Sequence, residues 1–150
     1  MSTIVTQASN SQTASSPLVF EPVDAATRLQ SSTEQWGHGV VVHASGEVDA
    51  YTLTTWQRLL REAAATATAP GYLVINLEPL GFIGCRAFAV LADQAQRCRR
   101  RGIQLRLVST ASIVTRIIAA ADLTELLPVY TSIDTGVDGK NARHWTGPGT

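Results

Sequence analysis

One six-residue stretch limits the possible folds more than any other part of the chain. Residues 72–77, Tyr-Leu-Val-Ile-Asn-Leu, are almost continuously apolar, which is typical of a central strand that is covered on both faces. Residues 53–68 and 85–101 flank this stretch, and in both of them apolar side chains recur every three or four positions, as on one face of a helix. Strands that alternate with helices of this length predict an α/β fold with a partly parallel sheet.

The rest of the chain continues this alternation. The expected elements are strands at 40–44 and 103–108, a short helix at 112–121, an extended piece at 126–130 and an N-terminal hairpin strand within about 25–40. Gly81 and Gly84 are interpreted as allowing a tight turn from the central strand into the second helix. We therefore expect a four- to five-stranded mixed sheet with helices packed mainly on one side.

The length of 150 residues suits one domain with loose ends. Residues 1–17 are mostly Ser, Thr, Gln and Ala without any period, and residues 136–150 hold four glycines and a proline. Both segments are expected to be flexible tails. The folded domain is expected at 18–135.

Charge and composition exclude several functional classes. Twelve Lys and Arg balance twelve Asp and Glu, whereas dedicated nucleic-acid-binding domains carry a basic excess. No apolar run approaches the roughly 18 to 20 residues that span a bilayer, and the N-terminus lacks the features of a signal peptide. We expect a cytoplasmic protein without membrane insertion or direct nucleic-acid contact.

The sequence contains none of the common catalytic motifs. It has neither a P-loop nor a Rossmann-type glycine pattern. His38, His43 and His144 fall on a loop, a strand and a tail, so no metal site is expected. Glu47 and Asp49 could form an acid–base pair, but no neighbouring residue completes a mechanism. We therefore expect a protein that is not an enzyme and that holds no cofactor.

Cys85 is the residue that comes nearest to a catalytic group. It follows a strand and begins a helix, where the helix dipole and the adjacent Arg86 favour a thiolate, as in rhodanese or cysteine-phosphatase loops. Those loops need an arginine six residues on, where this chain has Leu91, so an inert or mildly redox-sensitive thiol is favoured. Cys98 lies on the same predicted helix, roughly 20 Å away at 1.5 Å per residue, which is too far for a disulfide. It is expected in the core.

A cluster of basic residues ends the second predicted helix. Its members are Arg97, Arg99, Arg100 and Arg101. Cations at a helix C-terminus offset the helix dipole, and this explanation is favoured over contact with an acidic partner.

Five segments in order resemble the STAS domain, a family named for sulfate transporters and anti-sigma factor antagonists. They are Gly46-Glu47-Val48-Asp49-Ala50-Tyr51-Thr52 (family pattern G-E-L-D-x-x-T), residues 72–77 (L-V-L-D-L), residues 82–91 (F-L-D-S-S-G-L-x-V-L), residues 105–108 with 113–121, and residues 126–132 (L-L-P-V-Y-x-S). The resemblance covers roughly residues 25–135.

The resemblance implies a binding protein rather than a catalyst. Bacterial anti-sigma factor antagonists of this family capture an anti-sigma factor and so free a sigma factor for transcription. The anti-sigma factor is often a serine kinase that phosphorylates the second Ser of D-S-S-G, and the added charge of about −1.5 to −2 releases the antagonist. The implied partner is therefore an anti-sigma factor, with the protein itself a monomer or a weak dimer.

The chain departs from the family at this switch. Gly84, Cys85, Arg86 and Ala87 stand where the family has Asp, Ser, Ser and Gly. The phosphoacceptor position is Arg86, which no serine kinase can modify. Two consequences are open. Either binding is constitutive, with control by expression or by oxidation of Cys85, or the partner differs and presents an acidic group to Arg86.

The residues expected to contact the partner come from two of these segments. They are Glu47, Asp49, Thr52, Gly84, Cys85, Arg86 and Phe88. Several of these residues also have a structural explanation. Glu47 and Asp49 are explained equally well as residues that form the turn, and Thr52 as the N-cap of a helix. Phe88 is expected in the core first and at an interface second. Two other functions stay open: a STAS subunit of a larger signalling or transporter-associated complex, and an enzyme that uses the thiol of Cys85.

Overall fold

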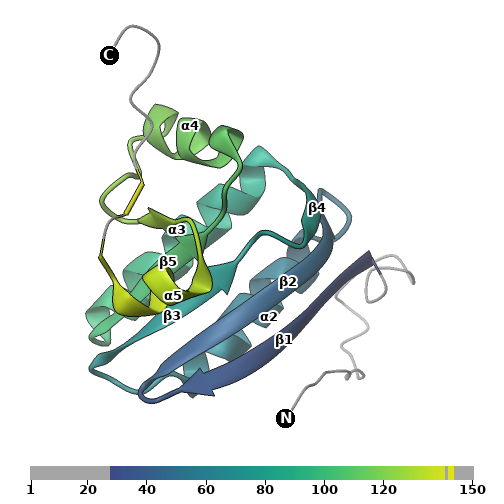
Figure 1. Ribbon diagram of the computed structural model, residues 1–150. Coiled ribbons are helices and arrows are strands. Elements are labelled where there is room, and N and C mark those ends of the chain that lie inside the picture. Colours follow the sequence, from purple (N-terminus) through teal and green to yellow (C-terminus); the bar gives the residue numbers. More distant parts are fainter. Residues whose placement is uncertain (1–27, 141, 144–150) are drawn as a thin grey trace, which may run out of the picture.

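The structure, a computed structural model, describes residues 28–140 and 142–143. Within these residues six strands form one sheet, and four helices pack around it (Figure 1). The strands are β1 (Leu29–Trp36), β2 (Gly39–Val48), β3 (Gly71–Asn76), β4 (Leu80–Ile83), β5 (Ile103–Val108) and β6 (Val129–Tyr130). The helices are α2 (Leu53–Thr66), α3 (Cys85–Arg100), α4 (Ser112–Ala120) and α5 (Ile133–Asp138). The expected α/β class is confirmed.

The sheet is mixed, as the sequence predicts. Its strand order is β1-β2-β3-β5-β6, and β4 pairs with β2 off this path. β1 is antiparallel to β2, and every other pair among the described strands is parallel. The carboxyl ends of the parallel strands therefore meet at one edge of the sheet, which is the usual place for a site in such folds.

The short strand β4 lies in a segment that we expected to be a turn. It pairs with the end of β2, beyond the stretch of β2 that pairs with β3. Pro79 and the glycines around it hide this strand in the sequence, because a four-residue strand has too few positions to show a period. The sheet consequently has six described strands where four to five were expected.

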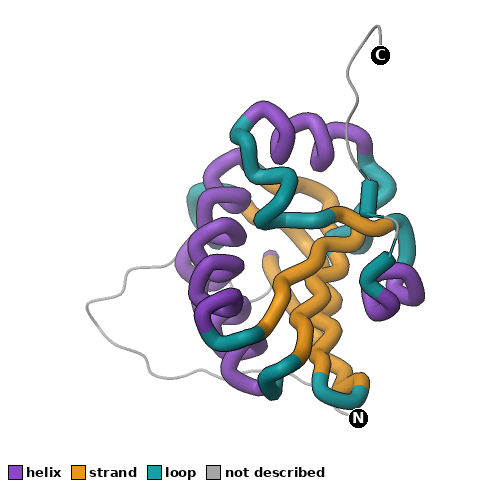
Figure 2. Tube along the Cα trace, turned by 90° about the vertical axis from the view of Figure 1, so that its left-hand side faces the viewer, coloured by secondary structure: helices purple, strands orange, loops and turns teal. Residues whose placement is uncertain are grey.

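Two layers of helix cover the sheet unequally. α2 and α3 pack on one face and enclose the main core, in which Trp56, Leu60, Leu73 and Leu91 are fully buried. α5 covers part of the other face over a smaller apolar cluster. Figure 2 shows the long helices on one side of the sheet and a single short helix on the other, so the expected one-sided packing is confirmed.

The C-terminal boundary expected at residue 135 is wrong. α5 continues to Asp138, and Arg143 donates from its guanidinium to the carbonyl of Ser109 at 2.8 Å. Reciprocal hydrogen bonds between Ser132 and Thr135 begin α5, and Gly139, with φ +79°, ends it. Residues 136–140 and 142–143 therefore belong to the folded part. The tail expected at 1–17 lies outside the described residues.

Candidate partner-binding site

The candidate site begins where β2 ends, at the segment Gly46–Thr52. Gly46 has a φ of +107°, and a Cβ there would overlap the carbonyl oxygen of Arg28, the residue just before β1. Glycine is therefore required at this position, both for the backbone conformation and for the close approach of the two strands. The pairing of β2 with β4 shifts register between Gly46 and Glu47.

Asp49 and Thr52 hold the turn that follows β2. Asp49 Oδ1 accepts hydrogen bonds from the backbone N–H groups of Tyr51 (2.9 Å) and Thr52 (3.2 Å). Thr52 Oγ1 donates to the carbonyl of Glu47 (2.8 Å) and accepts from the N–H of Asp49 (3.0 Å). Thr52 occupies the N-cap position of α2, as expected, but its side chain makes no cap bond to the helix. It is also fully buried, so it shapes the turn and cannot contact a partner.

Arg28 joins the two acidic residues of this segment. Its guanidinium donates to Glu47 at 3.0 Å and more closely to the carboxylate of Asp49, and it lies 6.0 Å from the centre of the Tyr51 ring. Burial raises the pKa of Asp49, but the hydrogen bonds from Arg28 and from the backbone of Tyr51 and Thr52 outweigh it, so this pKa lies below its usual value. Both carboxylates are thus already paired within the chain. The pairing of Arg28 with these carboxylates could not be predicted from the sequence, because only the register of β1 on β2 brings Arg28 to this turn.

The start of α3 is attached directly to the end of β2. Val48 pairs with Ile83, and the N–H of Gly84 donates to the carbonyl of Val48 at 2.9 Å. Gly84 is the N-cap of α3, and Cys85 and Arg86 follow in its first turn, both exposed. The structure therefore brings together the two sequence segments from which partner contacts were expected.

Phe88 is placed differently from the other expected contact residues. Only 2% of it is exposed, and it packs in the main core, so it does not form part of a binding surface. Two aromatic residues that the sequence analysis did not select are exposed at this edge instead: Tyr51 by 64% and Phe82 by 52%. We call the exposed group Tyr51, Phe82, Cys85 and Arg86 the β2/α3 surface.

The two cysteines occupy different environments. Cys85 is exposed on the β2/α3 surface, whereas Cys98 is buried in the core, and neither forms a disulfide. Burial raises the pKa of the Cys98 thiol. These positions agree with the expectation of a core Cys98.

The histidines do not gather at the site. His43 bonds to Asn76 at 3.0 Å on the sheet, His38 lies in an exposed turn, and His144 is outside the described residues. Among the described residues, no group of three or more His, Cys, Asp or Glu is placed to hold a metal ion. No helix of the described chain is long and apolar enough to cross a membrane.

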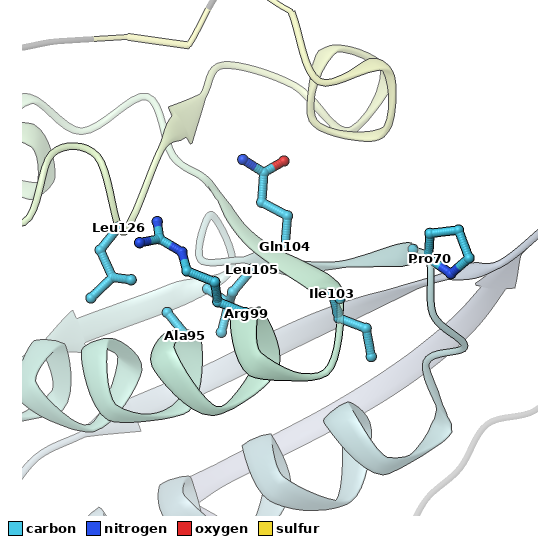
Figure 3. Close-up of a pocket in the computed structure, with 9 residues that line it drawn as sticks. Pro70, Ala95, Arg99, Ile103, Gln104, Leu105 and Leu126 are labelled. Carbon is cyan, nitrogen blue, oxygen red and sulfur yellow. The ribbon is translucent and has the colours of Figure 1, made fainter.

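A shallow cleft lies at the other end of α3. It has a volume of about 360 Å³ and is lined by residues from the end of α3, the start of β5 and the loop before β6, including Arg99, Gln104 and Leu126 (Figure 3). The neighbouring arginines have structural roles: Arg97 pairs with Asp93 at 2.9 Å, and Arg101 donates to the carbonyl of Ala64 at the end of α2. This cleft is separate from the β2/α3 surface.

Comparisons with known proteins agree with this geometry. The model of the STAS domain family matches residues 30–136. A Mycobacterium tuberculosis protein provisionally named anti-anti-sigma factor Rv2638 is 46% identical over 138 residues, which cover 91% of this chain and 93% of that relative. The anti-sigma-F factor antagonist RsfA of Mycobacterium tuberculosis is 46% identical over 109 residues, covering 73% of this chain and 85% of RsfA. The crystal structure of an anti-sigma factor antagonist from Mycobacterium paratuberculosis has the same fold, with a TM-score of 0.66 at 22% identity over 80% of this chain and 97% of that one.

Proposed function

The chain belongs to the STAS domain family, and we propose that it acts as an anti-sigma factor antagonist, which captures an anti-sigma factor in the cytoplasm and thereby frees a sigma factor for transcription. The names of its Mycobacterium tuberculosis relatives, an anti-anti-sigma factor and an anti-sigma-F factor antagonist, support this role. So does the shared fold of the Mycobacterium paratuberculosis antagonist.

The observation that carries the proposal is the attachment of α3 to β2. The bond from Gly84 to Val48 fixes the first turn of α3 beside the Asp49–Thr52 turn. Exposed aromatic and arginine side chains on such a fixed framework are typical of the residues that contribute most to protein–protein binding. The β2/α3 surface therefore has the composition of an interface, on a backbone that has little freedom to lose on binding.

Capture is proposed to occur without phosphorylation at the family position. Arg86 has no hydroxyl that a serine kinase could modify, so binding through this surface is constitutive with respect to that switch. We also propose that the protein binds without catalysis. The polar atoms of Asp49 and Thr52 are used in hydrogen bonds within the turn, and Cys85 is the one thiol that the β2/α3 surface exposes.

The proposal is tested by affinity capture from the native cytoplasm, followed by reconstitution. The tagged chain is used as bait under reducing and non-reducing conditions, and bound proteins are identified by mass spectrometry. We expect an anti-sigma factor, and we expect the purified chain to displace the sigma factor from the purified anti-sigma–sigma complex in size-exclusion chromatography. Recovery of no anti-sigma factor, or failure to displace the sigma factor, would overturn the proposal.

A matched pair of variants locates the interface. Phe82→Glu places a charge on the β2/α3 surface and is expected to abolish capture. Trp36→Glu changes another exposed aromatic residue, 38% exposed at the opposite end of β2 where Trp36 pairs with Gly39, and is expected to leave capture unchanged. Equal loss in both variants would argue against binding at this edge.

A further inference from the structure

Arg86 carries a charge that the described fold does not use. It is exposed in the first turn of α3 and makes no hydrogen bond or ion pair with any described residue. The N-terminal turn of a helix carries partial positive charge, which disfavours a cation, and the first turn of α3 contains no acidic residue to offset it. Within the described chain, the positive charge of Arg86 is therefore unfavourably placed at the N-terminal end of α3.

The acidic side chains at and after the carboxyl ends of β2 and β3 are already engaged. Arg28 pairs with both Glu47 and Asp49, and Glu78, in the loop that precedes β4, accepts two hydrogen bonds from Thr110 at 2.7 and 2.8 Å. None of these carboxylates lies within ion-pair distance of Arg86. Among the described residues no carboxylate supplies a counter-charge, so the guanidinium of Arg86 is available to a carboxylate of another molecule.

The exposed aromatic side chains of the β2/α3 surface favour a protein partner for Arg86. Phe82 lies against the start of α3, with its ring 3.6 Å from the position that a Cβ of Gly84 would take. More than half of Phe82 and of Tyr51 is exposed. Exposed aromatic rings and an arginine that no described residue pairs with are the residue types that contribute most to protein–protein binding.

We propose that the β2/α3 surface binds an acidic face of its partner, in which a carboxylate pairs with Arg86 while apolar groups pack on Phe82 and Tyr51. The inference rests on the proposed function, because the partner is taken to be the anti-sigma factor. It combines the two consequences that the sequence left open at position 86, namely capture without the phosphorylation switch and an acidic group that faces Arg86. Arg86 is then a specificity-determining residue, which favours a partner with a negatively charged group facing it.

The test measures affinity for the purified anti-sigma factor that the tagged chain recovers, by isothermal titration calorimetry at two salt concentrations. Arg86→Gln removes the charge and is expected to weaken binding by about tenfold; Arg86→Glu reverses it and is expected to weaken binding by on the order of a hundredfold. The affinity of the wild-type chain should fall with added salt, and that of Arg86→Gln should fall less. The matched control is Arg100→Glu, the same charge change on an exposed arginine at the other end of α3, which should leave affinity within twofold.

The outcomes separate the two proposals. If the wild-type chain binds no anti-sigma factor, both proposals fail. If it binds and Arg86→Glu binds equally well, or if Arg100→Glu weakens binding as much, only the acidic-face inference fails. Rescue of Arg86→Glu by an Asp→Lys or Glu→Lys change on the anti-sigma factor would identify the paired carboxylate. Circular dichroism of each variant checks that it remains folded, which the absence of contacts from Arg86 leads us to expect.

Discussion

The backbone N–H of Gly84 donates to the carbonyl of Val48 at 2.9 Å, and this bond joins the first turn of α3 to the last residue of β2. The two residues are far apart in the sequence, yet the bond fixes the orientation of Cys85 and Arg86 relative to the Asp49–Thr52 turn. In the core, the indole N–H of Trp56 donates to the carbonyl of Ala87 at 3.2 Å and so links α2 to the first turn of α3. The surface is therefore built on strand and helix ends rather than on a free loop.

Gly46→Ala is expected to destabilise the fold severely. The new Cβ would overlap the carbonyl oxygen of Arg28, and the φ of +107° is strained for any residue with a side chain. We expect a loss of about 3 kcal/mol or more in the free energy of unfolding, measured by urea denaturation. Gly81→Ala is the control, because the nearest atom to a Cβ there is 3.8 Å away, and similar losses in both variants would contradict the argument.

Thr52→Val tests the role of the buried hydroxyl. Valine keeps the shape but leaves the carbonyl of Glu47 and the N–H of Asp49 without the bonds that Thr52 Oγ1 makes. An unsatisfied buried polar group costs about 1–3 kcal/mol, and we expect a loss of this size in urea denaturation. Thr54→Val, on the exposed side of α2, should change stability little. A Thr52→Val variant as stable as the wild type would mean that the hydroxyl does not hold the turn.

Asp49 should make stability depend on pH in the acid range. Its pKa in the folded chain lies below the usual value of about 3.9, so the unfolded chain takes up the proton more readily. The stabilisation is therefore fully present above about pH 4 and is lost as the pH falls through the folded pKa. Asp49→Asn should lower stability at pH 7 by about 1–2 kcal/mol and flatten the profile between pH 5 and 2. Asp93→Asn, on an exposed helix surface, serves as the control; a wild-type profile with the same slope as Asp49→Asn would refute this role.

The two thiols should react at very different rates. Cys85 is exposed and Cys98 is buried with a raised pKa, and only the thiolate attacks disulfide reagents. We expect the native protein to release one equivalent of chromophore rapidly from an aromatic disulfide reagent, and two equivalents in denaturant. Cys85→Ser should remove the rapid phase. Two rapid thiols in the native wild-type protein would contradict the burial of Cys98.

The long elements could be predicted from the sequence because burial imposes its own period on them. In α3 the period places Phe88 and Leu91 on the inward face, where the structure has them. Because the period places Phe88 on the inward face of the helix, it also argues against Phe88 as a partner-contact residue. The exposure of Phe82 could not be obtained in this way, because it depends on the pairing of Phe82 with Glu47 across two strands that are distant in the sequence.

The parts that were missed differ in whether a local signal existed. β4 had none, since a four-residue strand among glycines becomes regular only when β2 supplies its hydrogen bonds. α5 did have one: Ser132 precedes Thr135 by three residues and Gly139 follows the last turn, which is the pattern of a capped helix. The role of Arg28 could be predicted only in part. The sequence shows a cation at this position, but its two carboxylate partners are defined only by the register of β1 on β2.

Arg86→Glu should make the isolated protein more stable although it weakens the proposed binding. A carboxylate in the first turn of a helix interacts favourably with the helix dipole, and the arginine that it replaces interacts unfavourably, so we expect a gain of about 0.3–1 kcal/mol at low salt. No contact is lost, because Arg86 makes none within the described fold. Arg100→Glu should have the opposite sign, since it places a negative charge at the C-terminal end of α3. Urea denaturation at low and at high salt measures both variants, and salt should reduce both effects. A stability loss in Arg86→Glu would show that Arg86 supports the fold, and its retention would then need no partner to explain it.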